Sequence, residues 1–265
     1  DFYNNDIFIC NDNFIEADGG THNIRILRNR CFNSGQQALS NQPVLAGPVY
    51  WIRNIVYNVG DASTFKFWGM YPAGILAYHN TSSGIFTRDD KPGSNVHLRN
   101  NLFLPSDEAS LASLGLYTYT DYSSLDYNGY RERRPFISYH APEEGQTYDF
   151  SNDHKALEYS SLKEFAEATG QEKHGITVDY DIFRNAHAPE FKEFREKYQA
   201  LGKVYPIYYP QDFDFRLKKG SKAVDAGVGL PGINDGYTGD APDLGAYELG
   251  KPVPHYGPRK KSEFK

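Results

Sequence analysis

The chain contains 265 residues, which is long enough for one large hydrophobic core or for a solenoid with an appended segment. Its formal net charge of −6 argues against a nucleic-acid partner, because no basic surplus is present to displace counterions from phosphates. No apolar run in the sequence is long enough to span a membrane. The 21 tyrosines and 17 phenylalanines suit carbohydrate binding, but they equally suit a solenoid core with hydrated edges, so composition leaves the partner open.

Residues 1–104 repeat one short unit that ends in an asparagine. Two alternating apolar residues precede the asparagine of each complete copy, as Ile24 and Ile26 precede Asn29. The steps between aligned asparagines are 24, 25, 26 and 21 residues, and these asparagines are Asn5, Asn29, Asn54, Asn80 and Asn101. Apolar alternation predicts strands and this period predicts stacked units, so the sequence indicates an all-β parallel β-helix. The asparagines are predicted to form a hydrogen-bonded ladder at one inner corner.

The two cysteines, Cys10 and Cys31, follow their asparagines by five and two residues. They should therefore lie about three positions apart on neighbouring coils. At ~3.3 Å per residue this offset is too long for a disulfide, so both are predicted to be buried thiols. Because Asp1 opens directly into a coil, we expect further coils and any export signal to precede it.

Residues 105–205 interrupt the repeat and are predicted to form an insertion with two short helices that cover the solenoid. Ser161 and Glu164 have the spacing of a capping box, in which Glu164 would bond the Ser161 amide, and Gly170 ends this helix. The second helix is predicted from Pro189 to Gly202. Residues 206–265 are loop-rich and are predicted to pack on the β-helix. Their acidic residues could cap turns or hold calcium, and these are Asp235, Asp240, Asp243 and Glu248.

The outward side chains of the coils are the candidates for chemistry. Ile15, Leu39 and Phe65 are 24 and 26 residues apart, which matches the asparagine period, so they should stack in the core. The residues after them should then stack outward in two columns, Glu16 with Ser40 and Lys66, and Asp18 with Gln42 and Trp68.

Glu16 and Asp18 should share a face at roughly 6.5–7 Å along the strand. Glycosidases need two carboxyl groups roughly 5–9.5 Å apart, one to protonate the leaving oxygen and one to activate water or to attack, so this pair is a candidate for catalysis. A lyase would instead use Lys66 or Arg88 as the base, with another cation or a calcium ion on the two carboxylates neutralising a uronic acid. The outward carboxylates are equally typical of solvated side chains, and His79 is equally compatible with a structural role. The predicted substrate contacts are Asp12, Gln42, Asp61, Trp68, Tyr71, His79 and Arg88.

Several runs of the sequence resemble the right-handed parallel β-helix repeat proteins of the pectate-lyase-like superfamily. They are NDNFIEADGG (11–20), NIRILRN (23–29), ILAYHNT (75–81), GSKAVDAG (220–227) and APDLGAYE (241–248). The resemblance implies the C-terminal portion of such a protein, with a right-handed coil. It also implies a polysaccharide partner, hydrolase or lyase activity or simple carbohydrate binding, and a location that is secreted, periplasmic or at the cell surface.

Overall fold

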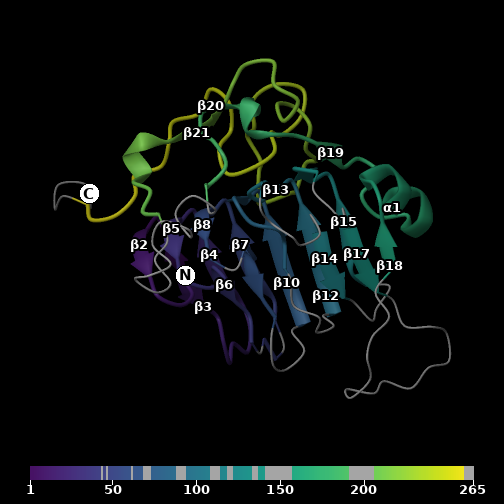
Figure 1. Cartoon of the computed structure of the whole chain (residues 1–265), viewed down its shortest axis with the longest axis horizontal. Coiled ribbons are helices and arrows are strands. Elements are labelled where there is room, and N and C mark those ends of the chain that lie inside the picture. Colours follow the sequence, from purple (N-terminus) through teal and green to yellow (C-terminus); the bar gives the residue numbers. More distant parts are fainter. Residues whose placement is uncertain are drawn as a thin grey trace.

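The computed structural model describes residues 1–42, 44–45, 47–60, 62–67, 73–87, 94–107, 114–117, 122–132, 137–140, 157–190 and 206–259. Within these residues the chain forms a parallel β-solenoid, in which successive coils add neighbouring strands to the same sheets (Figure 1). The predicted fold class is therefore confirmed. One α-helix occurs in the described part, and much of the C-terminal segment consists of loops.

Three parallel sheets form the walls of the solenoid. The first sheet contains β1 (Phe2–Tyr3), β4 (Ile24–Leu27), β7 (Val49–Ile52), β10 (Ala73–Tyr78), β12 (Ser94–Arg99) and β15 (Ser124–Asp126). The second sheet contains β2 (Asp6–Cys10), β5 (Arg30–Ser34), β8 (Ile55–Val59), β11 (Thr81–Ser82), β13 (Leu102–Phe103), β16 (Gly129–Tyr130) and β19 (Ile176–Thr177). The third sheet contains β3 (Ile15–Glu16), β6 (Leu39–Ser40) and β9 (Phe65–Lys66).

Two smaller sheets and the helix complete the described elements. One small sheet pairs β14 (Leu114–Tyr117) with β17 (Ile137–His140) in parallel and β17 with β18 (Leu157–Tyr159) in antiparallel orientation. The other pairs β20 (Phe183–Asn185) with β21 (Asp214–Leu217) in antiparallel orientation. The α-helix is α1 (Leu162–Thr169), and two short 3₁₀ turns cover Tyr180–Ile182 and Pro210–Asp212.

The asparagines form a ladder at the corner between the first and second sheets. Nδ2 of Asn29 donates to Oδ1 of Asn54 at 3.0 Å, and Nδ2 of Asn54 donates to Oδ1 of Asn80 at 3.0 Å. The backbone N–H of each donating residue bonds the same oxygen, so these fully buried amides are satisfied from both sides. The predicted ladder is confirmed, and it extends one step further because Asn101 donates to Asn128 at 2.9 Å.

A carboxylate ends the ladder. Oε1 of Glu172 accepts from Nδ2 of Asn128 at 2.7 Å and from the hydroxyl of Tyr130 at 2.7 Å. Glu172 is 1% exposed, and this burial raises its pKa to about 7. A hydrogen-bond acceptor thus stands where the next coil would present an asparagine oxygen.

The residue before each ladder asparagine adopts a left-handed backbone. The φ angles lie between 51° and 59° at Asn4, Arg28, Arg53, His79, Asn100 and Tyr127. This conformation costs roughly 1–2 kcal/mol for most side chains. The same tight corner in every coil keeps the asparagines in register, because each corner places its amide under the next one.

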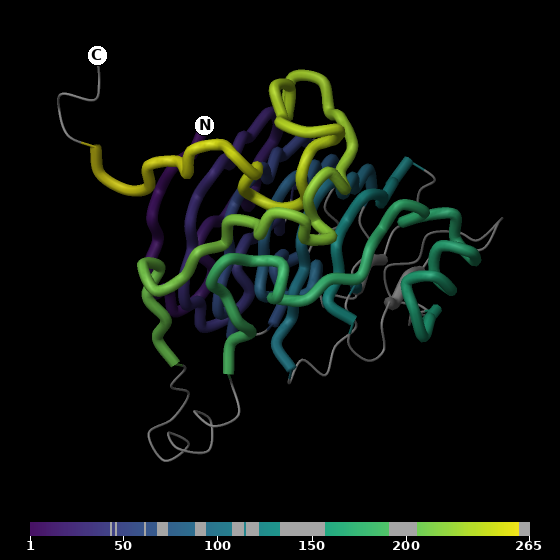
Figure 2. Tube along the Cα trace, turned by 90° about the horizontal axis from the view of Figure 1, so that it is seen from above, coloured from purple at the N-terminus to yellow at the C-terminus, as the bar shows by residue number. Residues whose placement is uncertain are grey.

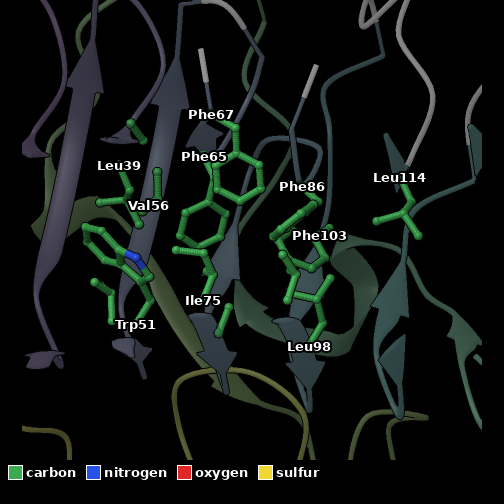
Figure 3. Packing of buried hydrophobic residues seen from close by; sticks show 14 of the residues in the cluster. Leu39, Trp51, Val56, Phe65, Phe67, Ile75, Phe86, Leu98, Phe103 and Leu114 are labelled. Carbon is green, nitrogen blue, oxygen red and sulfur yellow. The ribbon is translucent and has the colours of Figure 1, made fainter. Parts of the chain in front are cut away.

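The interior of the solenoid is filled by side chains from all three sheets, with aromatic rings stacked from coil to coil (Figure 3). The ring centroids of Phe65 and Phe86 are 5.2 Å apart, those of Phe86 and Phe103 are 5.7 Å apart, and those of Phe103 and Tyr130 are 5.9 Å apart. All four residues are fully buried. Each such pair stabilises the stack by about 0.5–1.5 kcal/mol beyond its burial of apolar area.

A second core lies on the outer face of the second sheet, beneath the C-terminal segment. Figure 2 shows this green and yellow segment running across the coils. The ring of Tyr57 lies 4.5 Å from that of Phe213, and its hydroxyl donates to the carbonyl of His187 at 2.8 Å. Leu102 and Leu104 of the solenoid belong to the same buried cluster. The central strands of the second sheet, β8, β11, β13 and β16, are therefore buried on both faces, whereas the edge strand β2 is largely exposed.

The stack of strands continues past residue 104, where the sequence alone suggests that it ends. Leu98 pairs with Leu125 in the first sheet, and Phe103 pairs with Tyr130 in the second. Gly129 then pairs with Ile176, which adds one more strand to the second sheet. The step from Asn101 to Asn128 is 27 residues, close to the other steps, but the polar Ser123 occupies the position of the first alternating apolar residue, which hides this coil from the repeat pattern.

The first predicted helix is present as α1, with Ser161 as its N-cap and Gly170 at its C-terminus with φ 72°. Glu164 reaches back to the backbone N–H of Ser160 at 2.8 Å, one residue before the predicted partner. Most of the second predicted helix lies outside the described residues. Both cysteines are free, as predicted, but Cys31 is buried whereas Cys10 is only partly buried.

The carboxylates near the C-terminus hold loops together. Asp243 accepts from the backbone N–H groups of Asp225 and Leu249 at 2.9 and 2.6 Å. Glu248 accepts from the N–H groups of Thr238 and Asp243 at 3.0 and 3.3 Å. In the described part of the chain, no group of three or more His, Cys, Asp and Glu side chains could hold a metal ion. These contacts favour the turn-capping alternative over calcium binding at this end.

Candidate functional site

The third sheet aligns the predicted outward column. Ile15 pairs with Leu39 and Leu39 with Phe65, while Glu16 pairs with Ser40 and Ser40 with Lys66. Leu39 and Phe65 are fully buried, so the residues that follow them lie on the opposite, outward side of the sheet. Glu16 is exposed and Lys66 is partly buried.

Asp18 follows β3 and is held by the neighbouring coil. Its Oδ1 accepts from the hydroxyl of Ser40 at 2.6 Å and from the backbone N–H of Gln42 at 2.8 Å. Ser40 is fully buried, so its hydroxyl can orient Asp18 but is not itself available to a ligand. Two donors from one coil thus fix the orientation of a carboxylate that remains exposed.

Glu16 is held by a neighbour in its own coil. Oε1 of Glu16 accepts from Nδ2 of Asn13 at 3.0 Å, and both Glu16 and Asp12 are exposed. Glu16 is the last residue of β3 and Asp18 lies in the turn that follows, and an extended chain between them would give a spacing of roughly 6.5–7 Å. This spacing falls within the range that acid–base cleavage of a glycosidic bond requires.

Not all of the other predicted site residues belong to the described part of the chain. Asp61, Trp68, Tyr71 and Arg88 lie outside the described residues. His79 is fully buried, and its Nε2 accepts from Nδ2 of Asn100 at 3.0 Å and from Nδ2 of Asn234 at 2.8 Å. Burial, reinforced by the charge of Arg53, holds the pKa of His79 well below its usual value. His79 therefore has a structural role in place of the predicted substrate contact, because it ties a corner of the solenoid to the C-terminal segment.

A polar cleft that the sequence does not predict lies beside the second core. Its central residue, Arg131, has an 8% exposed surface and directly follows β16. The Arg131 guanidinium forms ion pairs with Asp107, at 2.9 Å from Nη2, and with Asp179, at 2.7 Å from Nε, and it lies over the ring of Tyr180. These residues come from three separate segments with no common period, so the sequence carries no signal that unites them.

The comparisons with known proteins identify no relative. No protein-family model matches the chain, and neither a curated protein nor a solved structure is significantly similar to it. Among the helices of the described residues, none is long and apolar enough to cross a membrane.

Proposed function

We propose that this chain is a polysaccharide-active enzyme that hydrolyses glycosidic bonds, with Glu16 and Asp18 as its acid–base pair. The observation that carries the proposal is the register of the third sheet, which aligns Glu16, Ser40 and Lys66 from successive coils. Asp18, oriented by two donors, is suited to activating a water molecule. Glu16, whose side chain is exposed beside it, is suited to protonating the leaving oxygen.

The face also suits a polymer. Parallel coils are spaced by about 4.8 Å, so Lys66 lies roughly 9.5 Å along the solenoid axis from Glu16. A sugar chain bound along this axis would meet Glu16 and Asp18 on one coil and Lys66 two coils further on, with the buried Ser40 between them. Since such polymers are mainly extracellular, the proposal includes a secreted, periplasmic or cell-surface location.

Lys66 supports a second candidate, a lyase that acts on a uronic-acid polymer. Its side chain lies in the same column as Glu16. As the neutral amine it would abstract the proton next to the uronic carboxylate, and as the ammonium ion it would neutralise that carboxylate, a role that calcium held by Glu16 and Asp18 would also fill. Non-catalytic binding of carbohydrate at the same face is the remaining alternative. The products separate the three, because a lyase yields an unsaturated, ultraviolet-absorbing sugar, a hydrolase yields a saturated one, and a binding protein yields none.

The proposal is tested with Glu16→Gln and Asp18→Asn on a panel of neutral and uronic-acid polysaccharides. Both amides keep the oxygen that accepts the bonds from Asn13, Ser40 and the Gln42 backbone, so the fold should persist. Each variant should lower turnover by about 100-fold or more. Glu158→Gln, an exposed change in β18, is the matched control and should retain activity. Full activity in both site variants would refute the assignment of the pair.

A further inference from the structure

The charged side chains around Arg131 are held in place by several contacts. Nη1 of Arg131 donates to the backbone carbonyl of Pro105 at 3.0 Å. The carboxylates of Asp107 and Asp179 that bond its guanidinium have side chains that are 66% and 53% exposed. Asp179 also accepts from the backbone N–H of Tyr180 at 2.7 Å, which fixes it at the start of a 3₁₀ turn. Two exposed carboxylates are thus held in place by one buried cation.

Two cavities meet at this point. One, of about 600 Å³, extends from Arg131 toward residues 184–190, and the other, of about 550 Å³, extends toward residues 218–222. Arg131, Asp181 and Lys218 line both of them. Nζ of Lys218 donates to the carbonyl of Asp181 at 2.9 Å, so these two residues form a wall that both cavities share, here called the Asp181–Lys218 ridge. Each cavity has a volume that suits a small ligand, and together they form an extended cleft.

The lining identifies the chemistry of the ligand. Carboxylates and Lys or Arg side chains line the two cavities in equal number, five of each, and His187 also lines the first. A free anion or a free cation would meet as much repulsion as attraction there. One wall of the first cavity is apolar and is formed by Ala186, Ala188 and Pro189. A neutral sugar fits both features, since its hydroxyls donate to carboxylates and accept from guanidinium and ammonium groups, while its C–H face packs on an apolar wall.

We propose that this cleft is a second carbohydrate site, which binds a neutral oligosaccharide across the Asp181–Lys218 ridge. The cleft lies on the outer side of the second sheet, whereas Glu16 and Asp18 lie on the third sheet, so the two sites are separate. This site binds and does not cleave. It holds a polymer at a distance from the face proposed for catalysis.

The test is calorimetric titration of the whole chain with cellohexaose, xylohexaose, mannohexaose and, for comparison, hexagalacturonate. Asp181→Asn and Lys218→Met remove one charge each from the ridge, and both side chains are exposed, so the fold should persist. Asp240→Asn and Lys251→Met make the same changes at exposed positions outside the cleft and serve as matched controls. A thermal melt of every variant verifies folding.

Wild type should bind at least one neutral hexasaccharide, each ridge variant should weaken that binding about tenfold or more, and both controls should bind as wild type does. Glu16→Gln should also bind as wild type does, so a failure of the catalytic proposal leaves this test intact. The cleft proposal is overturned if no neutral hexasaccharide binds, if hexagalacturonate binds more tightly than all of them, or if the ridge variants bind unchanged. Loss of binding in Glu16→Gln alone would show that the sugar binds at the third sheet, and this result would also overturn the cleft proposal.

Discussion

Replacing Glu172 with glutamine should remove a pH-dependent loss of stability at the end of the asparagine ladder. Burial raises the pKa of this carboxyl from 4.5 to about 7. The folded state therefore holds the proton more tightly than the unfolded state does. Its contribution to stability is complete below pH 4.5 and is lost as the pH rises through about 7.

The size of the effect follows from the shift in pKa. At about 1.4 kcal/mol per pKa unit, the change from 4.5 to about 7 corresponds to about 3 kcal/mol. Glutamine cannot ionise, but its carbonyl oxygen can still accept from Asn128 and Tyr130, as Oε1 of Glu172 does. The stability of wild type relative to Glu172→Gln should therefore fall by about 3 kcal/mol between pH 4.5 and pH 8.

Guanidinium chloride unfolding, followed by circular dichroism at intervals across this range, measures the difference. Glu158→Gln, at an exposed position in β18, controls for the general effect of removing one negative charge. If the free-energy difference between wild type and Glu172→Gln stays constant from pH 4.5 to pH 8, the carboxyl does not bind its proton as the buried geometry implies. The reasoning would then be wrong.

Three further predictions concern the stability of the solenoid and use the same unfolding assay. Asn54→Ala leaves two buried donors of the neighbouring coil without an acceptor and should cost about 2–5 kcal/mol, whereas Asn5→Ala at the end of the ladder should cost less than about 1 kcal/mol. Equal costs would show that the ladder bonds are not the cause. Burial lowers the pKa of His79, so its neutral form stabilises the fold above about pH 6.5 and this contribution is lost as the pH falls. His79→Asn should therefore weaken the acid sensitivity of the fold. Asparagine is chosen because Asn100 adopts the same left-handed backbone at the equivalent corner of the next coil. An unchanged acid profile would contradict this role. Trp51→Ala removes a fully buried ring and should cost about 3–5 kcal/mol, and a cost below about 1 kcal/mol would contradict its place in the core.

The fold could be predicted from the sequence because one period fixes both the corner and the walls of each coil. The asparagine steps locate the corner, and the matching steps between Ile15, Leu39 and Phe65 set the register of the third sheet. The coil that contains Asn128 is less visible, because the polar Ser123 stands where the other complete copies have their first apolar residue. A repeat is visible in a sequence only where each copy keeps the residue types that define it.

The candidate site could be predicted only in part, because the sequence gives the face of a side chain but not what covers it. The alignment of Glu16 with Lys66 follows from the period, whereas the burial of Ser40 depends on Asp18 of the preceding coil. His79 is covered by Asn234, which is 155 residues away in the sequence. The cleft around Arg131 has the same origin, since contacts between distant, non-repeating segments leave no pattern in the sequence.

The asparagine ladder has a direction. Each amide donates toward the C-terminal end and accepts from the N-terminal end, so every joint between two coils is the same. A whole coil inserted into or deleted from the middle of the ladder would therefore meet its neighbours with the correct donor and acceptor. The steps of 21 to 27 residues between joints already show that the loops absorb differences in length. Proteins of this architecture can thus change length by whole coils, and the face that they present to a polymer grows or shrinks by the same unit.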